Sequence, residues 1–337
     1  MILNDIQAIE KIFEGIRGKR VGIVTHEFPD GDGLSVSIGL YQVLKAIYEA
    51  DPYIIMDSEY PSFLEFLEYK KCRIMSFAQY QSEVNSDFDL LVVLDCHEPD
   101  RIDCDPSIYK KSKQVLVIDH HEVIGESLVN EYSYFVDREA TSTGVILHRA
   151  LFELLKSKVE GVVPEWMEIY RDSIYTSIVN DTDNFANSNS NRETFTVISD
   201  LMILGLKPYL LVKQFIFNHP VEYFRFIGST LSTIAKKDHI AYFVATQKML
   251  KDNGLKEDAY SKMMRWVKGA KDVWIMVSFQ EYENNLWRVS LRSETHDMAE
   301  IAQHFEGGGH KKASGFQLIG DIETIKDQVL TYIESVL

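Results

Sequence analysis

The sequence is poor in the residues that mark secreted, fibrous and membrane-spanning proteins. It contains three cysteines, Cys72, Cys96 and Cys104, with no C-x-x-C pair or zinc-ligand spacing, so we expect reduced thiols in a cytoplasmic protein. Its 18 glycines and 8 prolines are too few for a fibrous or low-complexity chain. The longest candidate apolar run, Leu90–Leu94, is far shorter than the roughly 18 residues of a membrane span, so no membrane partner is expected.

Positive charge is also scarce. Lys and Arg number 35 against 51 Asp and Glu, which gives a formal net charge of −16. Because non-specific binding to long nucleic acid needs a basic surface, this balance argues against a protein that binds long duplex nucleic acid. It does not exclude a small anionic substrate held by metal ions, since a metal supplies positive charge locally.

Length and composition indicate a folded chain of two domains. The 337 residues exceed the usual size of one domain, and 45% hydrophobic with 26% charged residues is ordinary for globular proteins. A chain of this length can bury a large core without help from metals or disulfides. Metal ligands, where they occur, are therefore better explained by function than by stability.

The N-terminal half alternates apolar runs with helical patterns. The runs Val21–His26, Leu90–Cys96 and Val115–His121 are rich in β-formers and end in polar residues, and segments with helical spacing, such as 34–48, lie between them. Strands separated by helices predict a parallel sheet that is buried on both faces. We assign residues 1–190 to this α/β, Rossmann-like domain.

The rest of the chain changes character twice. Residues 191–235 are helical almost throughout, with breaks before Pro208 and Pro220, and we assign them to a helical linker. Residues 236–337 carry consecutive strands with few helices between them, which predicts a smaller, mixed-sheet α+β domain.

Four acidic or histidine clusters follow predicted strands or helices. They are His26 to Asp32, Asp95, Asp119-His120-His121, and Asn180-Asp181-Thr182-Asp183. Taken singly, each can be explained as a turn, a helix cap or surface histidines, and Gly31 and Gly33 are expected to supply backbone angles that a side chain would forbid. Because ligands bind beyond the carboxyl ends of the strands in open parallel sheets, we expect the clusters to lie together.

The clusters offer carboxylate and imidazole donors, which suit Mn²⁺ or Mg²⁺ better than structural zinc. Two metal ions about 3.5–4 Å apart need a bridging carboxylate, and Asp95 is our choice because a short residue on a central strand is held rigidly. The carboxylates of Asp30, Asp32, Asp95 and Asp181 carry four negative charges, which two divalent ions would cancel. Without metals they would repel each other and any phosphate.

In this pattern the sequence resembles the DHH phosphoesterase family, named for the triplet that stands here at 119–121. His26 to Asp32 match the family's H-x-x-P-D-x-D motif at every defined position, and Asp95 and Asp181-Thr182 match two further motifs. Arg292-Ser293 and the pattern GGGH-x-x-A-x-G at 307–315 match the DHHA1 domain. The chain departs from the family at 33–36, where Ala-x-Gly-Ser is usual, and at Asp183, where glycine is usual.

The resemblance implies a role for each motif residue. One metal ion would be held by His26, Asp30 and Asp95, and the other by Asp32, Asp95, His120 and Asp181. With Asp95, the catalytic residues would be His121, facing the substrate phosphate or leaving group, and Asp119, supporting the histidines. The nucleotide would be bound by Arg292, Ser293, Gly307, Gly308, Gly309 and His310, in a DHHA1 domain that closes over the site and places it in the cleft between the domains.

Within the family, the domain composition resembles the oligoribonuclease and pAp-phosphatase group. This implies hydrolysis of short oligoribonucleotides (nanoRNA) to mononucleotides, and of 3′-phosphoadenosine 5′-phosphate (pAp) to AMP, by a hydroxide activated by two metal ions, Mn²⁺ in preference to Mg²⁺. Three alternatives stay open: a phosphodiesterase of cyclic or linear dinucleotides (c-di-AMP or pApA), an inorganic pyrophosphatase, and a nucleotide-binding sensor without catalysis. A homodimer is compatible with the sequence.

Overall fold

The computed structural model of the chain describes residues 3, 5–27, 29–67, 69–121, 132–159, 161–260, 263–267 and 269–337. It separates into two compact units, which we call unit 1 (Met1–Asn218) and unit 2 (His219–Leu337). Residues 191–218, predicted to begin a linker, therefore pack with unit 1. The domain boundaries at 190 and 235 and the cleft between domains stay predictions.

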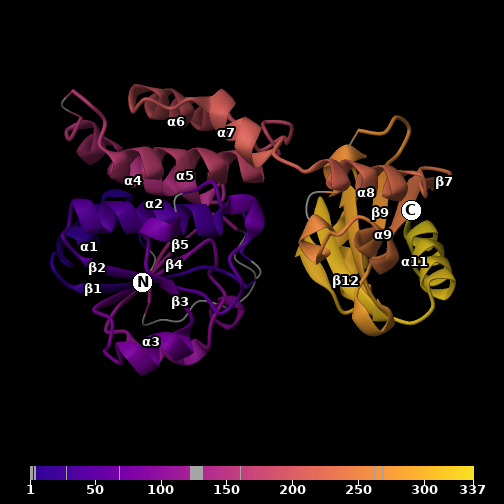
Figure 1. Cartoon of the computed structure of the whole chain (residues 1–337), viewed down its shortest axis with the longest axis horizontal. Coiled ribbons are helices and arrows are strands. Elements are labelled where there is room, and N and C mark those ends of the chain that lie inside the picture. The colour runs from indigo at the N-terminus through magenta and orange to yellow at the C-terminus, as the bar shows by residue number, and fades with distance from the viewer. Residues whose placement is uncertain are drawn as a thin grey trace. The chain divides into compact units, whose positions relative to one another are not determined.

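A six-stranded parallel sheet forms the centre of unit 1 (Figure 1). Its strands are β1 (Arg20–Val24), β2 (Asp51–Ile55), β3 (Ile74–Met75), β4 (Leu90–Leu94), β5 (Val115–Asp119) and β6 (Ser133–Val136). Every residue of β4 and β5 is buried, as their continuous apolar sequences predict. The strand order β3-β2-β1-β4-β5-β6 reverses direction between β1 and β4, and ligands of open α/β sheets bind at such a switch point.

Helices cover both faces of this sheet. One face is covered by α1 (Gln7–Glu14), α2 (Gly33–Ala46), α4 (Thr143–Lys156) and α5 (Glu165–Asp181), and the other by α3 (Phe77–Glu83) (Figure 1). The helices α6 (Arg192–Ile203) and α7 (Pro208–Phe215) pack outside α4 and α5. Among the described helices, none alone is long and apolar enough to cross a membrane, and only α6 and α7 together, bent by 111°, reach that length and composition.

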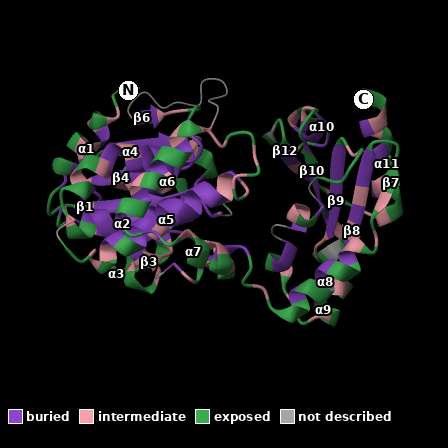
Figure 2. Cartoon of the chain, turned by 90° about the horizontal axis from the view of Figure 1, so that it is seen from above, coloured by how far each residue is buried: buried purple, intermediate pink, exposed green. Residues whose placement is uncertain are grey.

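The helix α2 is apolar on all sides because it lies between the sheet and α5. Twelve of its residues are buried, which Figure 2 shows as an almost continuous purple helix. A Cβ atom at Gly39 would lie 3.1 Å from Cβ of Ser173, so glycine lets the two helices approach closely. This packing fixes the start of α2, and with it Asp32, relative to the end of α5, where Asp181 lies.

Unit 2 contains a mixed six-stranded sheet in the order β11-β12-β10-β9-β8-β7. Its strands are β7 (Ala235–Lys237), β8 (Ile240–Ala245), β9 (Ile275–Glu281), β10 (Leu286–Ser293), β11 (Gly308–His310) and β12 (Ala313–Ile319). Only β8 and β9 pair in parallel. The helices α10 (Met298–His304) and α11 (Ile322–Val336) cover one face, and α8 (Val221–Leu231) and α9 (Gln247–Asp252) pack against the other.

The structure confirms the predicted fold class of a parallel α/β sheet followed by a mixed α+β sheet. Sequence patterns missed β2, β3, β6, β7 and β11. The strand β2 begins with Asp51-Pro52, β3 has two residues and β6 has four. None of these segments presents the long apolar run that identifies a buried strand.

Candidate active site

Side chains from four separate segments meet beyond the carboxyl ends of β1, β4 and β5. The loop after β1 contributes His26, Asp30 and Asp32, and Asp95 follows β4 directly. The end of β5 contributes Asp119-His120-His121, and Asp181 ends α5. The structure thus brings together all the residues of unit 1 that the sequence marked as site residues.

The first group of potential metal ligands comprises His26, Asp30 and Asp95. Nε2 of His26 lies 3.6 Å from Oδ1 of Asp30 and 3.4 Å from Oδ2 of Asp95. One ligand atom of each residue lies within 4.8 Å of the other two. A metal ion can therefore be reached by all three side chains.

The second group comprises Asp32, His120 and Asp181, with Asp95 at its edge. Nε2 of His120 lies 3.6 Å from Oδ2 of Asp32, 3.5 Å from Oδ1 of Asp95 and 3.1 Å from Oδ2 of Asp181. Asp32 is fully buried, and Asp181 and His120 have side-chain exposures of 13% and 15%. Such a half-enclosed set of oxygen and imidazole atoms can hold a divalent cation.

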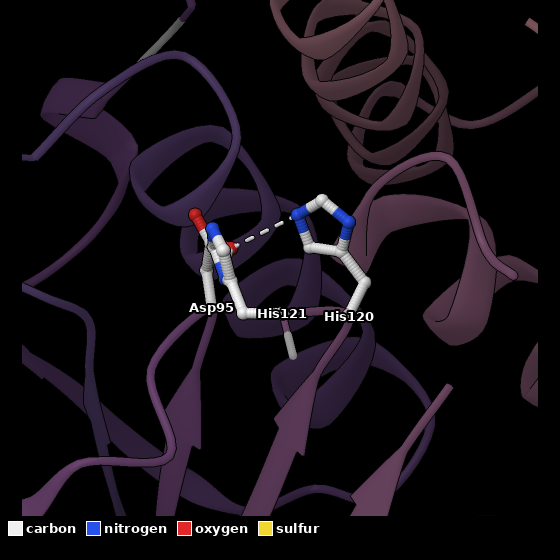
Figure 3. Close-up of side chains that lie close together, drawn as sticks. All are labelled: Asp95, His120 and His121. Carbon is white, nitrogen blue, oxygen red and sulfur yellow. Dashed lines mark ion pairs between the residues drawn. The ribbon is translucent and has the colours of Figure 1, made fainter. Parts of the chain in front are cut away.

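Asp95 connects the two groups through its two carboxylate oxygens. Oδ2 faces His26, while Oδ1 faces His120 and lies 3.4 Å from Nδ1 of His121. Figure 3 shows Asp95, His120 and His121 turned toward one another beyond their strands. The backbone of Asp95 has φ 59°, a left-handed conformation that is uncommon for residues other than glycine and recurs at functional sites.

Asp119 holds the two neighbouring histidines in place. Its fully buried Oδ1 accepts hydrogen bonds from the backbone N–H groups of His120 and His121, at 2.7 and 3.1 Å, and lies 2.8 Å from Nδ1 of His121. Its Oδ2 pairs with Nδ1 of His97. Sequence analysis passed over His97, although its position two residues after Asp95 could have drawn attention to it.

The start of α4 is a second contribution that sequence analysis missed. The backbone N–H of Thr143 donates a 2.8 Å hydrogen bond to Oδ2 of Asp32, and its hydroxyl donates a 3.3 Å bond to Oδ1 of Asp95. Ser142, the N-cap of α4, makes no side-chain capping bond. The positive end of the helix dipole therefore lies against both carboxylates.

Glycine is required at positions 31 and 33 because a side chain would not fit there, and not because the backbone has an unusual φ angle. Neither residue has a positive φ, so the expected reason was wrong. A Cβ atom at Gly31 would lie 2.5 Å from Oδ1 of Asn180, and one at Gly33 would lie 2.0 Å from Oγ1 of Thr25. Asn180 occupies that space because its amide donates hydrogen bonds of 2.9 and 3.0 Å to Asp30 and Asp181.

The departure at Asp183 has a conformational explanation. Asp183 has φ 46°, and the two residues after it are also left-handed. Glycine adopts this region without cost, and aspartate tolerates it better than most residues. The turn after Asp181 can therefore keep the same path with either residue.

Crowded carboxylates make the site favourable for cations. Burial, together with the charges of Asp95 and Asp181, raises the pKa of Asp32 well above its ordinary value. Burial likewise raises the pKa of Asp181. Burial would lower the pKa of His26, but hydrogen bonds with Asp30 and Asp95 outweigh it and raise the pKa to about 12. Bound metal ions would replace these protons as the neutralising charge.

Two buried carboxylate oxygens of the site fit bound metal ions. Within the described part of the chain, Oδ1 of Asp32 accepts no hydrogen bond, and Oδ2 of Asp181 has the ring nitrogen of His120 3.1 Å away as its neighbour. Leaving a buried carboxylate oxygen without a partner is costly. Both atoms belong to side chains of the second group, so a cation bound there would satisfy them.

The site residues predicted in unit 2 share one end of its sheet. Arg292 pairs with Ala313 across β10 and β12, and Ala313 pairs with His310 of β11, whose backbone alone is described. A Cβ atom at Gly307 would lie 2.3 Å from the carbonyl oxygen of Gly315, and one at Gly309 would lie 2.6 Å from Cα of Ser314. Gly307 and Gly309 therefore permit close approach to β12, whereas Gly308 faces open space.

Ser293, the remaining predicted residue, is buried at the end of β10. Its hydroxyl accepts hydrogen bonds from the backbone N–H groups of Thr295 and His296, at 3.1 and 3.0 Å. This turn directs the chain away from the sheet immediately after Arg292-Ser293. The contacts give Ser293 a structural part in holding the loop that follows.

Two family models match the chain in agreement with these sites. The DHH family N-terminal domain matches residues 20–177, and the DHHA1 domain matches residues 239–335. A curated relative from Thermus thermophilus, named bifunctional oligoribonuclease and PAP phosphatase NrnA, is 29% identical over 98% of this chain and 94% of its own length. The cyclic-di-AMP phosphodiesterase GdpP of Bacillus subtilis is 26% identical over 93% of this chain but only 48% of its own length.

A solved structure shows the same fold. An exopolyphosphatase-related protein from Bacteroides fragilis superposes with a TM-score of 0.84 and 22% identity, covering 98% of this chain and 97% of that protein. The two matched domains, in this order, account for most of the sequence and contain every residue of the clusters except Asp181 and its neighbours. The chain belongs to the DHH family, with an N-terminal DHH domain followed by a DHHA1 domain.

Proposed function

We propose that the protein is a metal-dependent phosphoesterase that hydrolyses short oligoribonucleotides to mononucleotides and pAp to AMP. The observation that carries this proposal is the position of Asp95, whose two carboxylate oxygens face two separate groups of potential metal ligands. A carboxylate placed in this way suits a pair of metal ions, and paired metal ions are typical of phosphate-ester hydrolysis. The relative from Thermus thermophilus bears a name that describes these activities.

Two divalent ions, Mn²⁺ in preference to Mg²⁺, would be held by the two groups. His26, Asp30 and Asp95 would hold one ion, and Asp32, Asp95, His120 and Asp181 the other. When bound, the ions supply an activated water and neutralise charge on the phosphate. A mixed oxygen and imidazole donor set without thiolates favours Mn²⁺.

His121 is the proposed proton donor to the leaving oxygen. Burial would lower the pKa of His121, but its hydrogen bond with Asp119 outweighs this effect and raises the pKa, so the ring can carry a proton. Because Nδ1 pairs with Asp119, the ring is held with Nε2 as the atom that would serve the substrate. Asp119, held in turn by His97, keeps this orientation.

Arg292 and the glycine strand β11 are the proposed binding elements for the nucleotide. Arginine binds phosphate through two parallel hydrogen bonds, and the open space at Gly308 lets an anion approach the backbone. In a chain with net charge −16, such local groups favour short substrates over long nucleic acid. Small nucleotides of the cytoplasm fit this description.

A phosphodiesterase of cyclic or linear dinucleotides is the second candidate. The similarity to GdpP favours it, but that protein is about twice as long as the matched region. Both candidates use the same metal ligands, so the site in unit 1 does not separate them. The difference must come from the residues that contact the nucleotide.

A panel of substrates with Mn²⁺ tests the proposal. We expect turnover of pAp and of di- to pentanucleotides, slower turnover of cyclic di-AMP and none of inorganic pyrophosphate. Faster turnover of cyclic di-AMP than of a trinucleotide would favour the second candidate. Binding of these nucleotides without hydrolysis of any of them would identify a sensor and contradict the proposed enzyme.

A further inference from the structure

One row of cross-strand partners runs through the whole sheet of unit 2 and contains Arg292. From one edge of the sheet to the other, the partners are Lys236, Ala241, Met276, Arg292, Ala313 and His310. Directly paired residues of adjacent strands place their side chains on the same face. The motif residue Arg292 therefore shares its face with Met276, Ala241 and Lys236.

A pocket of about 450 Å³ opens on this face beside the motif residues. Ala241 and Met276 line it from the sheet, and Trp266 lines it from the end of a short 3-10 helix, Met263–Trp266, that precedes β9. Adjacent strands lie about 4.8 Å apart, so the pocket begins one strand away from Arg292. Its size is in the range of pockets that hold small molecules.

Trp266 offers a fixed aromatic wall. Its Nε1–H donates a 3.3 Å hydrogen bond to the hydroxyl of Tyr223, and its ring meets Phe224 edge-on at 5.9 Å. With 40% of the residue exposed, the indole is held at its edge while it also lines the pocket. Tryptophan in such a position provides a surface on which a nucleobase can stack.

The charge of the pocket is opposite to that of the chain. Lys236 and Lys271 line it, and no carboxylate lies among its described lining residues. Both lysines are exposed, and neither side chain makes a hydrogen bond or ion pair with another described residue. In a protein of net charge −16, two unpaired lysines at an apolar pocket favour a ligand with an apolar ring and a phosphate.

We propose that this pocket, which we call the Trp266 pocket, binds the base of the substrate nucleotide whose phosphate Arg292 holds. The base stacks on Trp266 above Ala241 and Met276, and Lys236 and Lys271 bind the next phosphate of the same substrate. The proposal rests on the proposed function and extends it, because it gives substrates with a base and a second phosphate an advantage over simple phosphate esters. The Trp266 pocket thus determines specificity without touching the reacting atoms.

Steady-state kinetics with Mn²⁺ on the dinucleotide pApA and on bis-p-nitrophenyl phosphate test the proposal. In Trp266→Ala we expect KM for pApA to rise about tenfold with kcat within twofold, and no change on the chromogenic diester. Trp266→Phe should restore most of the affinity. The double variant Lys236→Met/Lys271→Met should raise KM for pApA about tenfold and weaken its dependence on salt.

Lys237→Met is the matched control. Lys237 follows Lys236 in β7, points to the other face and pairs with Glu334, so its replacement should leave both substrates unaffected. The proposal is overturned if KM for pApA stays within twofold in the Trp266 and double-lysine variants, or if the diester is affected equally.

A binding measurement separates this proposal from the proposed function. If the wild-type chain hydrolyses neither pApA nor the chromogenic diester, this result contradicts the proposed function but does not bear on the Trp266 pocket. Calorimetric titration of pApA into Asp95→Asn, with and without Trp266→Ala, then tests whether the Trp266 pocket binds the nucleotide, independently of hydrolysis. Tenfold weaker binding with Trp266→Ala supports the pocket, and unchanged binding overturns it.

Discussion

The two units build their sites in different ways. In unit 1, residues from 26 to 181 converge because parallel strands end at one edge of the sheet, and the resulting site is acidic. In unit 2, strand register places the motif residues Arg292 and His310 in one row across the sheet, with Ala313 between them, and the pocket one strand away from Arg292 is basic. The difference fits the proposed function, in which unit 1 would bind the cations and perform the reaction while unit 2 would bind the anionic substrate.

Replacement of Asp95 should have the largest effect and should act on all substrates alike. We expect Asp95→Asn to reduce kcat about a thousandfold or more on pAp and on a chromogenic diester, because it removes the carboxylate that faces both ligand groups. Asparagine also tolerates the left-handed backbone at this position, so the fold should persist. Kinetics and circular dichroism measure the two effects.

Asp103→Asn is the control for this substitution. Asp103 is equally buried but pairs with Ser58 outside both ligand groups, so we expect activity to be retained. Near-normal turnover in Asp95→Asn would show that Asp95 does not bridge two metal ions.

Replacement of Arg292 should separate the substrates. We expect Arg292→Ala to lower kcat/KM about a hundredfold on pAp, since a bidentate phosphate contact is lost, and at most threefold on a chromogenic diester. Arg288→Ala, four residues earlier on the same strand, controls for the loss of one positive charge from unit 2. Equal losses on both substrates would contradict the assignment of nucleotide binding to unit 2.

Thr143 offers a finer test within unit 1. Thr143→Val keeps the backbone hydrogen bond to Asp32 but removes the hydroxyl that bonds Asp95. Because groups that orient metal ligands commonly change affinity tenfold to a hundredfold, we expect Mn²⁺ affinity to fall about tenfold and Thr143→Ser to restore it. Calorimetric titration measures both, and a Thr143→Ser variant as weak as Thr143→Val would exclude the hydroxyl as the cause.

His148 predicts a difference in acid stability between the units. Burial in the core of unit 1 lowers the pKa of His148 to about 3, although Asp200 lies 3.8 Å from its Nε2. None of the described histidine side chains of unit 2 is buried. Below about pH 6.5 the unfolded chain binds a proton at His148 that the folded chain does not bind, so the contribution of His148 destabilises unit 1 as the pH falls from about 6.5 to 3.

The expected loss from His148 is about 1.4 kcal/mol for each pH unit within that range. Urea unfolding at pH 7 and pH 5 should show a smaller decrease for His148→Gln than for the wild type. An identical decrease in both proteins would show that His148 does not control the acid sensitivity.

Much of this architecture could be predicted from sequence because it depends on local patterns. Continuous apolar runs marked β1, β4 and β5, and the polar residues after them marked the site. What could not be predicted depends on long-range packing. The contact of Thr143 with Asp32 joins positions 111 residues apart, and a side chain is excluded at Gly31 by Asn180, which lies in a distant part of the sequence.

The row of partners in unit 2 shows the same limit. The central strands of that row, β8, β9 and β10, are recognisable from their own residues, but the register that sets Met276 beside Arg292 follows from the folded sheet. The short strands β3 and β6 were missed because two and four residues are too few to show a strand pattern in the sequence.

The stoichiometry of Mn²⁺ binding tests the central claim most directly. Calorimetric titration of the metal-free chain at pH 7.5, with metal analysis of the dialysed protein, should find two Mn²⁺ ions per wild-type chain, with affinity falling as the pH is lowered. The account also predicts that the Asp95→Asn variant binds neither Mn²⁺ ion. A wild-type chain that binds no manganese, or that hydrolyses pAp equally well in excess chelator, would contradict the account.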